Sequence, residues 1–148
     1  MSEDVTESTM FGDSEFCRIL FERSTAGIFL LEGEGDDAGR VVAANTAAAA
    51  MHDRTLEEII GMSVWDFEPS EYAAALEERF ERIHREGSIS GEVEHFRRDG
   101  SRFPVEYHAH LVDLAGRKYV LSFVDDVSEK RHTEEELRSC EERLRSMV

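Results

Sequence analysis

The clearest hydrophobic pattern in the chain is a strict alternation between Phe103 and Leu111. A period of two is typical of a β-strand that buries one face and leaves the other wetter. The inward set would be Phe103, Val105, Tyr107, Ala109 and Leu111, and the outward set Glu106, His108 and His110. We therefore expect a half-buried strand in this region.

Turn signals lie on both sides of this strand. Asp99-Gly100 separates it from the run 89–96, and Ala115-Gly116 separates it from the run 118–126. Glycine adopts positive φ without steric cost, so Asp-Gly between two strand-forming runs is a strong hairpin signal. The sequence thus predicts an antiparallel meander of three strands over residues 89–126.

The first half of the chain predicts a strand hairpin followed by a helix start. Residues 26–32 have the apolar composition of a buried strand, 33–39 form a turn-rich acidic loop, and 40–44 return as the partner strand. Asn45 then suits the N-cap of an alanine-rich turn.

Helix signals dominate from residue 55 to residue 87. Thr55 and Glu58 have the spacing of a capping box. Gly87 is a suitable stop for a longer helix, whose apolar residues recur at helical spacing: Tyr72, Leu76, Phe80 and Ile83. With an amphipathic helix from Ser14, this order predicts an α+β fold: a five-stranded antiparallel sheet, short helices on one side, and N- and C-terminal helices.

Length and composition favour one compact domain. We expect a flexible acidic N-terminus over 1–13, the domain over 14–127, and a C-terminal linker or coiled-coil helix over 128–148. The formal net charge of −16 argues against nucleic-acid binding. Cys17 and Cys140 form no disulfide framework, which fits a reducing, cytoplasmic location. No apolar run approaches the roughly 18 residues of a membrane span, so we expect no membrane contact by this segment.

Several segments, in order, resemble a PAS domain. They are Ala26–Glu32 and Val41–Asn45 as the opening strands, Leu56–Gly61 as a short-helix signature, Arg97–Gly100 with Phe103–Glu106 as the hairpin, and Asp126–Ser128 as the junction to the exit helix. The resemblance implies a sensory or signal-relay module, as in two-component systems, that binds a small molecule or cofactor non-covalently and signals through its C-terminal helix to an output domain.

The resemblance also implies a pocket between sheet and helices. Its candidate residues are Met51, Trp65, Phe80, Val93, Tyr107 and Phe123. Trp65 and Tyr107 carry polar groups that could orient a ligand. The alternative is that all six are ordinary core residues of a ligand-free PAS domain that only dimerises and spaces its neighbours.

The segment 61–67 lacks the cysteine that covalent flavin attachment requires, which argues against that branch of the family. Haem is disfavoured because Glu71 stands where the family's haem-binding members carry their ligand, and His84 lies near the end of the long helix. Non-covalent flavin or a small organic ligand remains open.

The sequence gives little support to a metal site or to catalysis. His108 and His110 share a strand face, with His95 as a third histidine that could lie near them, but no further ligands are evident. Asp66, Glu68 and Glu106 show no nucleophile–base spacing, and we expect these carboxylates to be solvated. A small α+β enzyme is the weakest alternative, and we expect no enzymatic activity.

We expect homodimer contacts through the two terminal helices; the alternative is that the C-terminal helix is a lone solvated helix. Its a/d-type positions are Lys130, Thr133, Leu137, Cys140, Leu144 and Met147, a short seam that favours a weak parallel pairing. We expect Asp126 to anchor the junction with this helix by pairing with an arginine or by capping the helix. The tail 142–148 also resembles 15–21, so it either begins a further PAS unit or is an unrelated amphipathic start.

Overall fold

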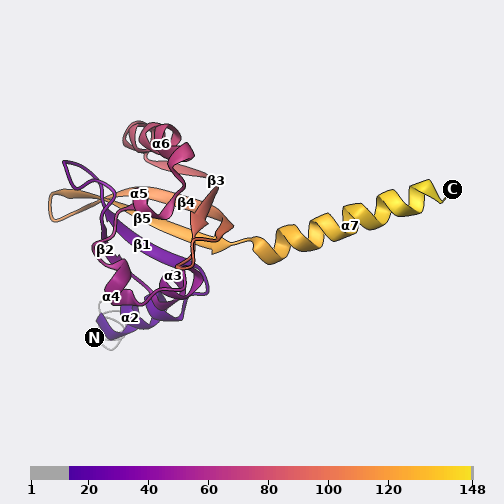
Figure 1. Ribbon diagram of the computed structural model, residues 1–148. Coiled ribbons are helices and arrows are strands. Elements are labelled where there is room, and N and C mark those ends of the chain that lie inside the picture. The colour runs from indigo at the N-terminus through magenta and orange to yellow at the C-terminus, as the bar shows by residue number, and fades with distance from the viewer. Residues whose placement is uncertain (1–13, 148) are drawn as a thin grey trace, which may run out of the picture.

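The computed structural model describes residues 14–147, and the expectation of a flexible segment over 1–13 lies outside the described residues. Within that range the elements follow in this order: α2 (Ser14–Arg23), β1 (Gly27–Glu32), β2 (Val41–Ala44), α3 (Thr46–Met51), α4 (Leu56–Ile59), α5 (Val64–Phe67), η1 (Ser70–Tyr72), α6 (Ala73–Glu86), β3 (Ser88–Phe96), β4 (Arg102–Leu114), β5 (Arg117–Asp126) and α7 (Ser128–Ser146) (Figure 1).

The strands of the described chain form a five-stranded sheet in the order β2-β1-β5-β4-β3, with antiparallel pairing throughout. The β3–β4 turn carries Gly100 at φ 85°, and the β4–β5 turn carries Ala115 and Gly116 at φ 52° and 80°. Both turns lie where the sequence predicts them. The predicted α+β architecture, with its C-terminal meander, is therefore confirmed.

One face of the sheet carries the hydrophobic core. Along β4 the predicted alternation is confirmed, because Phe103, Val105, Tyr107 and Ala109 are buried while His108 and His110 are exposed. The helices cover this inner face. Their buried contributions to the same core are Ala48 and Ala49 from α3, Ile59 from α4, Phe67 from α5 and Ile83 from α6.

Asn45 fixes the junction of β1, β2 and α3, and its predicted role as an N-cap is confirmed. Its side-chain oxygen accepts hydrogen bonds from the Ala48 N–H at 3.0 Å and the Ile28 N–H at 2.8 Å. Its amide group donates to the carbonyls of Phe21 and Ala26 at 2.9 and 3.0 Å. Since Asn45 is fully buried, these bonds satisfy its amide where water cannot.

Capping boxes start the two short helices α4 and α5. The predicted box of Thr55 and Glu58 opens α4, and a second box of Ser63 and Asp66 opens α5. These short turns direct the chain back over the sheet, so that Phe67 enters the core. The helix α6 then runs to Gly87, whose φ of 87° ends it as predicted.

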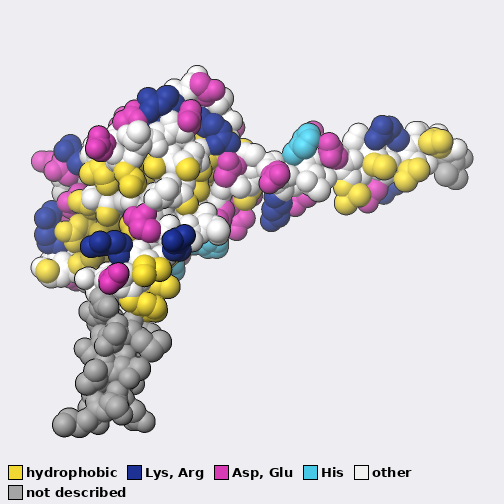
Figure 2. Space-filling model, turned by 90° about the horizontal axis from the view of Figure 1, so that it is seen from below, with side chains coloured by type: hydrophobic (Ala, Val, Ile, Leu, Met, Phe, Trp, Pro, Cys, Tyr) yellow, Lys and Arg dark blue, Asp and Glu magenta, His cyan; other side chains and the backbone are white. Residues whose placement is uncertain are grey.

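The helix α7 projects away from the domain (Figure 1). None of its described side chains is buried, and Leu137, Leu144 and Met147 are all more than half exposed. Figure 2 shows apolar side chains spaced along this projecting helix. Among residues 14–147, no helix combines the length and apolar composition needed to cross a membrane.

Candidate functional site

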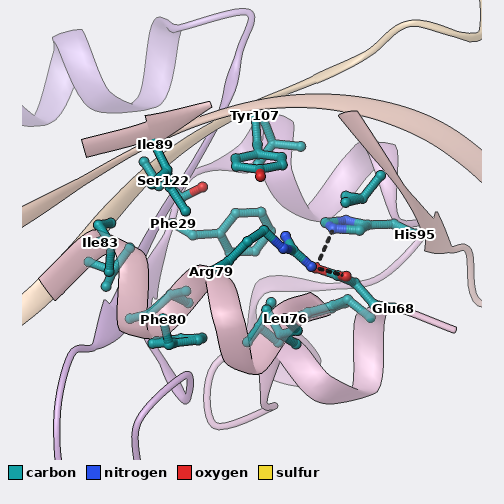
Figure 3. A pocket seen from close by; sticks show the side chains of 17 residues that line it. Phe29, Glu68, Leu76, Arg79, Phe80, Ile83, Ile89, His95, Tyr107 and Ser122 are labelled. Carbon is teal, nitrogen blue, oxygen red and sulfur yellow. Dashed lines mark hydrogen bonds and ion pairs between the residues drawn. The ribbon is translucent and has the colours of Figure 1, made fainter. Parts of the chain in front are cut away.

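A cavity of about 60 Å³ lies between α6 and the inner face of the sheet (Figure 3). Most of its wall is apolar. Phe29 of β1 forms the back, Leu76, Phe80 and Ile83 of α6 form one side, and Ile89 of β3 closes the far end. The strands position their residues by alternation, because every second side chain points inward.

One end of the cavity is polar and carries a buried ion pair. The Glu68 side chain is only 2% exposed, and one of its oxygens accepts a short hydrogen bond from Arg79 Nη2. The Arg79 guanidinium lies 5.2 Å from the centroid of the Tyr107 ring. Arg79 Nε is buried without a hydrogen-bond partner. A buried donor of this kind is costly unless a further acceptor reaches it.

Two buried histidines extend this polar end into the core. His95 Nε2 lies 4.0 Å from Glu68 Oε2, and His95 Nδ1 lies 2.8 Å from His52 Nε2. His52 Nδ1 lies 2.7 Å from the Ala48 carbonyl. A carbonyl only accepts, so His52 donates from Nδ1 and accepts from His95 Nδ1–H. When both rings are neutral, His95 Nε2 is therefore left as an acceptor facing the Glu68 carboxylate.

Burial dominates the protonation of this cluster. Burial lowers the pKa of His52 to about 4. The hydrogen bond to Ala48 raises this pKa and the charge on Arg97 lowers it further, but burial is the largest cause. Burial, the neighbouring His52 and Arg79 hold the pKa of His95 well below its ordinary value. Burial raises the pKa of Glu68, although the hydrogen bond and charge of Arg79 oppose that change. Both histidines are therefore neutral near pH 7, and burial makes Glu68 easier to protonate than an exposed glutamate.

Contacts continue from His52 to the start of α7. The His52 ring packs edge-on against Phe103, with ring centroids 5.2 Å apart, and the Arg97 guanidinium lies 4.0 Å from the centroid of the Phe103 ring. Arg97 donates to the Met51 carbonyl and, at 2.9 Å, to Asp126 Oδ2.

Asp126 also binds the first residue of α7. Its Oδ1 accepts hydrogen bonds from Ser128 N at 2.9 Å and from Ser128 Oγ at 2.5 Å. Partial burial raises the pKa of Asp126, but the hydrogen bonds from Ser128 and Arg97 together lower it below its usual value. The predicted pairing of Asp126 with an arginine at this junction is confirmed.

The six pocket residues predicted from the sequence fall into two groups. Phe80, Val93 and Tyr107 line the cavity, whereas Met51, Trp65 and Phe123 do not. Phe123 is out of phase with Ser122 and Val124, which face inward, and it packs near His110 on the other face of the sheet. Trp65 is 41% exposed and stacks outside the cavity against Phe80, because the inward position of α5 is taken by Phe67.

Two predictions about polar residues are wrong. Glu68 is buried rather than solvated, because α5 and η1 direct it toward α6. His95 does not lie near His108 and His110, because it pairs across the sheet with inward-facing Phe103. Within the described residues, no group of three or more histidine, cysteine or acidic side chains could hold a metal ion.

The two residues considered as haem ligands lie outside the cavity wall. Glu71 is exposed and forms an ion pair with Arg102. His84 Nε2 lies 2.6 Å from the Gly33 carbonyl oxygen.

Two of the polar residues at the cavity, His95 and Arg79, have sequence positions that indicate weakly that they face inward. His95 is in phase with Ile89 and Val93 on a strand of period two. Arg79 is three residues from Leu76 and four from Ile83, so it shares their helix face. Nothing in the sequence around Glu68 indicates its burial.

Comparisons with known proteins agree with this fold. A family model described as PAS domain matches residues 25–129. A methyl sulfide methyltransferase-associated sensor from Methanosarcina acetivorans is 33% identical over 92 residues, which are 62% of this chain and 9% of that protein. The chain therefore matches only a small part of that relative's length.

Solved structures show the same fold. The PAS domain of an HTR-like protein from Haloarcula marismortui has a TM-score of 0.68 at 26% identity, covering 84% of this chain and 97% of that one. A PAS domain from a two-component sensor histidine kinase has a TM-score of 0.65 at 18% identity, covering 76% and 94%. With the matched family model, these likenesses establish that the chain belongs to the PAS domain family of sensor domains.

Proposed function

We propose that this PAS domain binds a small molecule non-covalently in the cavity beneath α6 and relays the bound state through α7 to an output domain. The observation that carries the proposal is the buried cluster at the polar end of the cavity, which connects by close contacts to Asp126 at the base of α7. Two-component signalling is the setting that best suits such a module, and a cytoplasmic location remains a prediction.

The size of the cavity limits the ligand. A cavity of roughly 150 Å³ is enough for benzene, and this one holds about 60 Å³. Flavin and haem are several times larger than benzene, so either would require extensive repacking of α6. A molecule of a few non-hydrogen atoms is the better match for the cavity.

The relay would work through the contacts that end at Asp126. A ligand that moves Arg79 or changes the charge on Glu68 alters the environment of His95, and His95 is hydrogen-bonded to His52. His52 packs on Phe103, which in turn lies against the Arg97 guanidinium. Because Arg97 holds Asp126, a small shift there changes the first turn of α7. Two discrete arrangements differing by a few kcal/mol are sufficient for such switching.

We propose further that the domain is not an enzyme, because PAS sensory domains are generally non-enzymatic.

We also propose that α7 mediates weak parallel homodimer contacts. The exposed Leu137 and Leu144 lie on the predicted seam with Cys140, which is also exposed and free. Parallel pairing would bring the two Cys140 thiols within disulfide reach. Mild oxidation should then give a covalent dimer that Cys140→Ser abolishes and Cys17→Ser does not; a monomer that never crosslinks at high concentration would contradict the pairing.

A ligand-free dimerisation scaffold is the competing function, and filling the cavity separates the two. We would titrate the protein with 1-propanol and follow backbone amide chemical shifts by NMR. Shifts should occur at residues lining the cavity and at the first turn of α7, and not elsewhere on the surface of the domain. Ala109→Leu, which points a larger side chain into the cavity, should remove these shifts.

The matched control is Ala43→Leu in β2. Ala43 pairs with Leu30, which alternates with the inward-facing Phe29 and Leu31 and so faces away from the cavity. This variant should keep the response of the parent protein. The result could also be negative: neither 1-propanol nor short-chain carboxylic acids and amides added as ligands change the backbone amide chemical shifts around the cavity. In that case the scaffold is the correct function.

A further inference from the structure

We propose that the cavity takes a short-chain carboxylate together with one proton, with Arg79 holding the carboxylate and Glu68 sharing the proton. This inference rests on the proposed function, because it names the ligand class of the same cavity. Three observations carry it: an unpaired donor on Arg79, the charge balance of the site, and the facing acceptors of Glu68 and His95.

Among the described residues, none accepts a hydrogen bond from Arg79 Nε. A guanidinium carries five N–H donors in one plane, and a carboxylate matches two of them. Arg79 Nη2 binds Glu68, while Nε is buried with no partner. Arg79 is also the cationic side chain among the residues that line the cavity. A ligand oxygen that accepts from Nε would therefore satisfy an otherwise costly buried donor.

The remaining wall suits a short apolar body with one polar end. Phe80, Ile83 and Ile89 line the space on the side away from Glu68 (Figure 3). The volume of about 60 Å³ is under half of the roughly 150 Å³ that accommodates benzene, so a ligand that fits must be smaller than benzene. Acetate and propionate have this size and this division into a polar head and an apolar tail.

The charge balance requires a proton to enter with the ligand. Arg79 supplies one positive charge, and the Glu68 carboxylate already neutralises it. A second carboxylate in this dry site would leave one negative charge unpaired, which is unfavourable in a low-dielectric interior. Two carboxylates that share one cation therefore retain one proton between them.

The surroundings of Glu68 offer a place for that proton. The groups that face Glu68 are Arg79 from α6 and His95 from β3, with His52 behind His95 and Tyr107 of β4 under Arg79. His95 Nε2 and Glu68 Oε2 are both acceptors, 4.0 Å apart, when the histidines are neutral. A proton on Glu68 converts this pair of acceptors into a donor and an acceptor. Burial also raises the pKa of Glu68 and lowers that of His95, so it favours the protonated form of Glu68 and the neutral form of His95.

The test is calorimetric titration of sodium propionate into the full chain at pH 7, in two buffers that differ in ionisation enthalpy. The expected result is uptake of about one proton per propionate bound. Affinity should rise about tenfold for each unit by which the pH is lowered, as linkage to one proton requires. Binding of propionate without proton uptake would overturn the proposal.

Variants of the ion pair separate the roles of the two residues. Glu68→Gln keeps the shape of the side chain and releases Arg79, so propionate should bind at least about tenfold tighter at pH 7 and without proton uptake. The double variant Glu68→Gln with Arg79→Met leaves no buried charge and should lose propionate binding. Arg82→Gln, on the same helix but paired with Glu86, should bind like the parent protein.

1-Propanol distinguishes failure of this inference from failure of the proposed function. If 1-propanol binds in the cavity and propionate does not, the carboxylate proposal is wrong while a sensory cavity stands. If neither molecule binds, both are wrong. If Glu68→Gln still takes up a proton with propionate, Glu68 is not the group that shares it.

Discussion

Two arginine–carboxylate pairs mark the two ends of the proposed relay, and they differ in their surroundings. Arg79 and Glu68 are 13% and 2% exposed, whereas Arg97 and Asp126 are 30% and 27% exposed. Burial outweighs the arginine at Glu68 and raises its pKa, whereas hydrogen bonds outweigh burial at Asp126 and lower its pKa. The same pairing therefore leaves a carboxylate whose charged form is disfavoured by burial at the cavity and one whose charged form is favoured at the helix.

This difference suits the roles that we propose for the two ends. A sensing group should respond when its surroundings change, and burial makes the charge on Glu68 depend strongly on its partner Arg79. An anchor should keep one state, and Asp126 is held by Ser128 as well as by Arg97. Perturbing each pair separately tests the contrast.

The largest effect is expected from breaking the buried pair. Arg79→Met should lower the free energy of unfolding by about 3–5 kcal/mol, because it leaves Glu68 buried without its partner. The double variant with Glu68→Gln should recover most of that loss, since a neutral pair of similar volume needs no counter-charge. Urea unfolding of both variants measures the difference.

Arg82→Gln provides the matched surface control for this prediction. Its pair with Glu86 is about half exposed, so the change should stay within about 0.5 kcal/mol. Equal losses for Arg79→Met and the double variant would show that packing, rather than the unpaired charge, causes the loss.

The fold could be predicted from the sequence because its signals are local. Alternation along β4, the glycine at each hairpin and the caps at Asn45 and Thr55 each depend on residues close together in the chain. Such signals set the strands and turns before any long-range contact is known. Asp126 was also predictable, because it lies at a recognisable junction of strand and helix.

The polar end of the cavity could not be predicted, because it is assembled from distant segments. Glu68, Arg79 and His95 come from three elements, and His52 lies 43 residues before its hydrogen-bond partner. Charged residues are rarely buried unless they are paired, and the pairing is visible only in three dimensions. Trp65 shows the opposite case: the sequence places it beside the pocket segments, but its side chain is exposed and lies outside the cavity wall.

The second largest effect concerns acid stability. The pKa of His52 falls from 6.5 to about 4 on folding, so the unfolded chain binds more protons between these pH values. The stability that neutral His52 provides is complete above pH 6.5 and is lost as the pH falls toward 4. The loss amounts to about 3 kcal/mol for a shift of this size. Urea unfolding as a function of pH should show this slope, and His52→Gln should reduce it.

Glu68 has the opposite effect on stability in the same experiment. Its pKa is raised in the folded protein, so folding takes up protons at this group and its contribution to stability increases as the pH falls. The contribution of His52 is therefore the difference between the parent protein and His52→Gln at each pH. His132→Gln is the control, since His132 is exposed on α7. An unchanged slope in His52→Gln would mean that His52 does not cause the acid sensitivity.

The smallest effect is expected at the exposed end of the relay, where Asp126→Asn removes the charge but keeps the shape. Weakening the partly exposed pair with Arg97 and the hydrogen bonds from Ser128 should lower the free energy of unfolding by about 1 kcal/mol. Amide hydrogen exchange is the more sensitive measurement here. Loss of the contacts of Asp126 should speed exchange in the first turn of α7 even where global stability changes little. Asp125→Asn is the matched control, since Asp125 is exposed and pairs across the sheet with Glu106. If both variants leave exchange in α7 unchanged, Asp126 does not couple the sheet to the helix, and the contrast between the two ion pairs has no bearing on signalling.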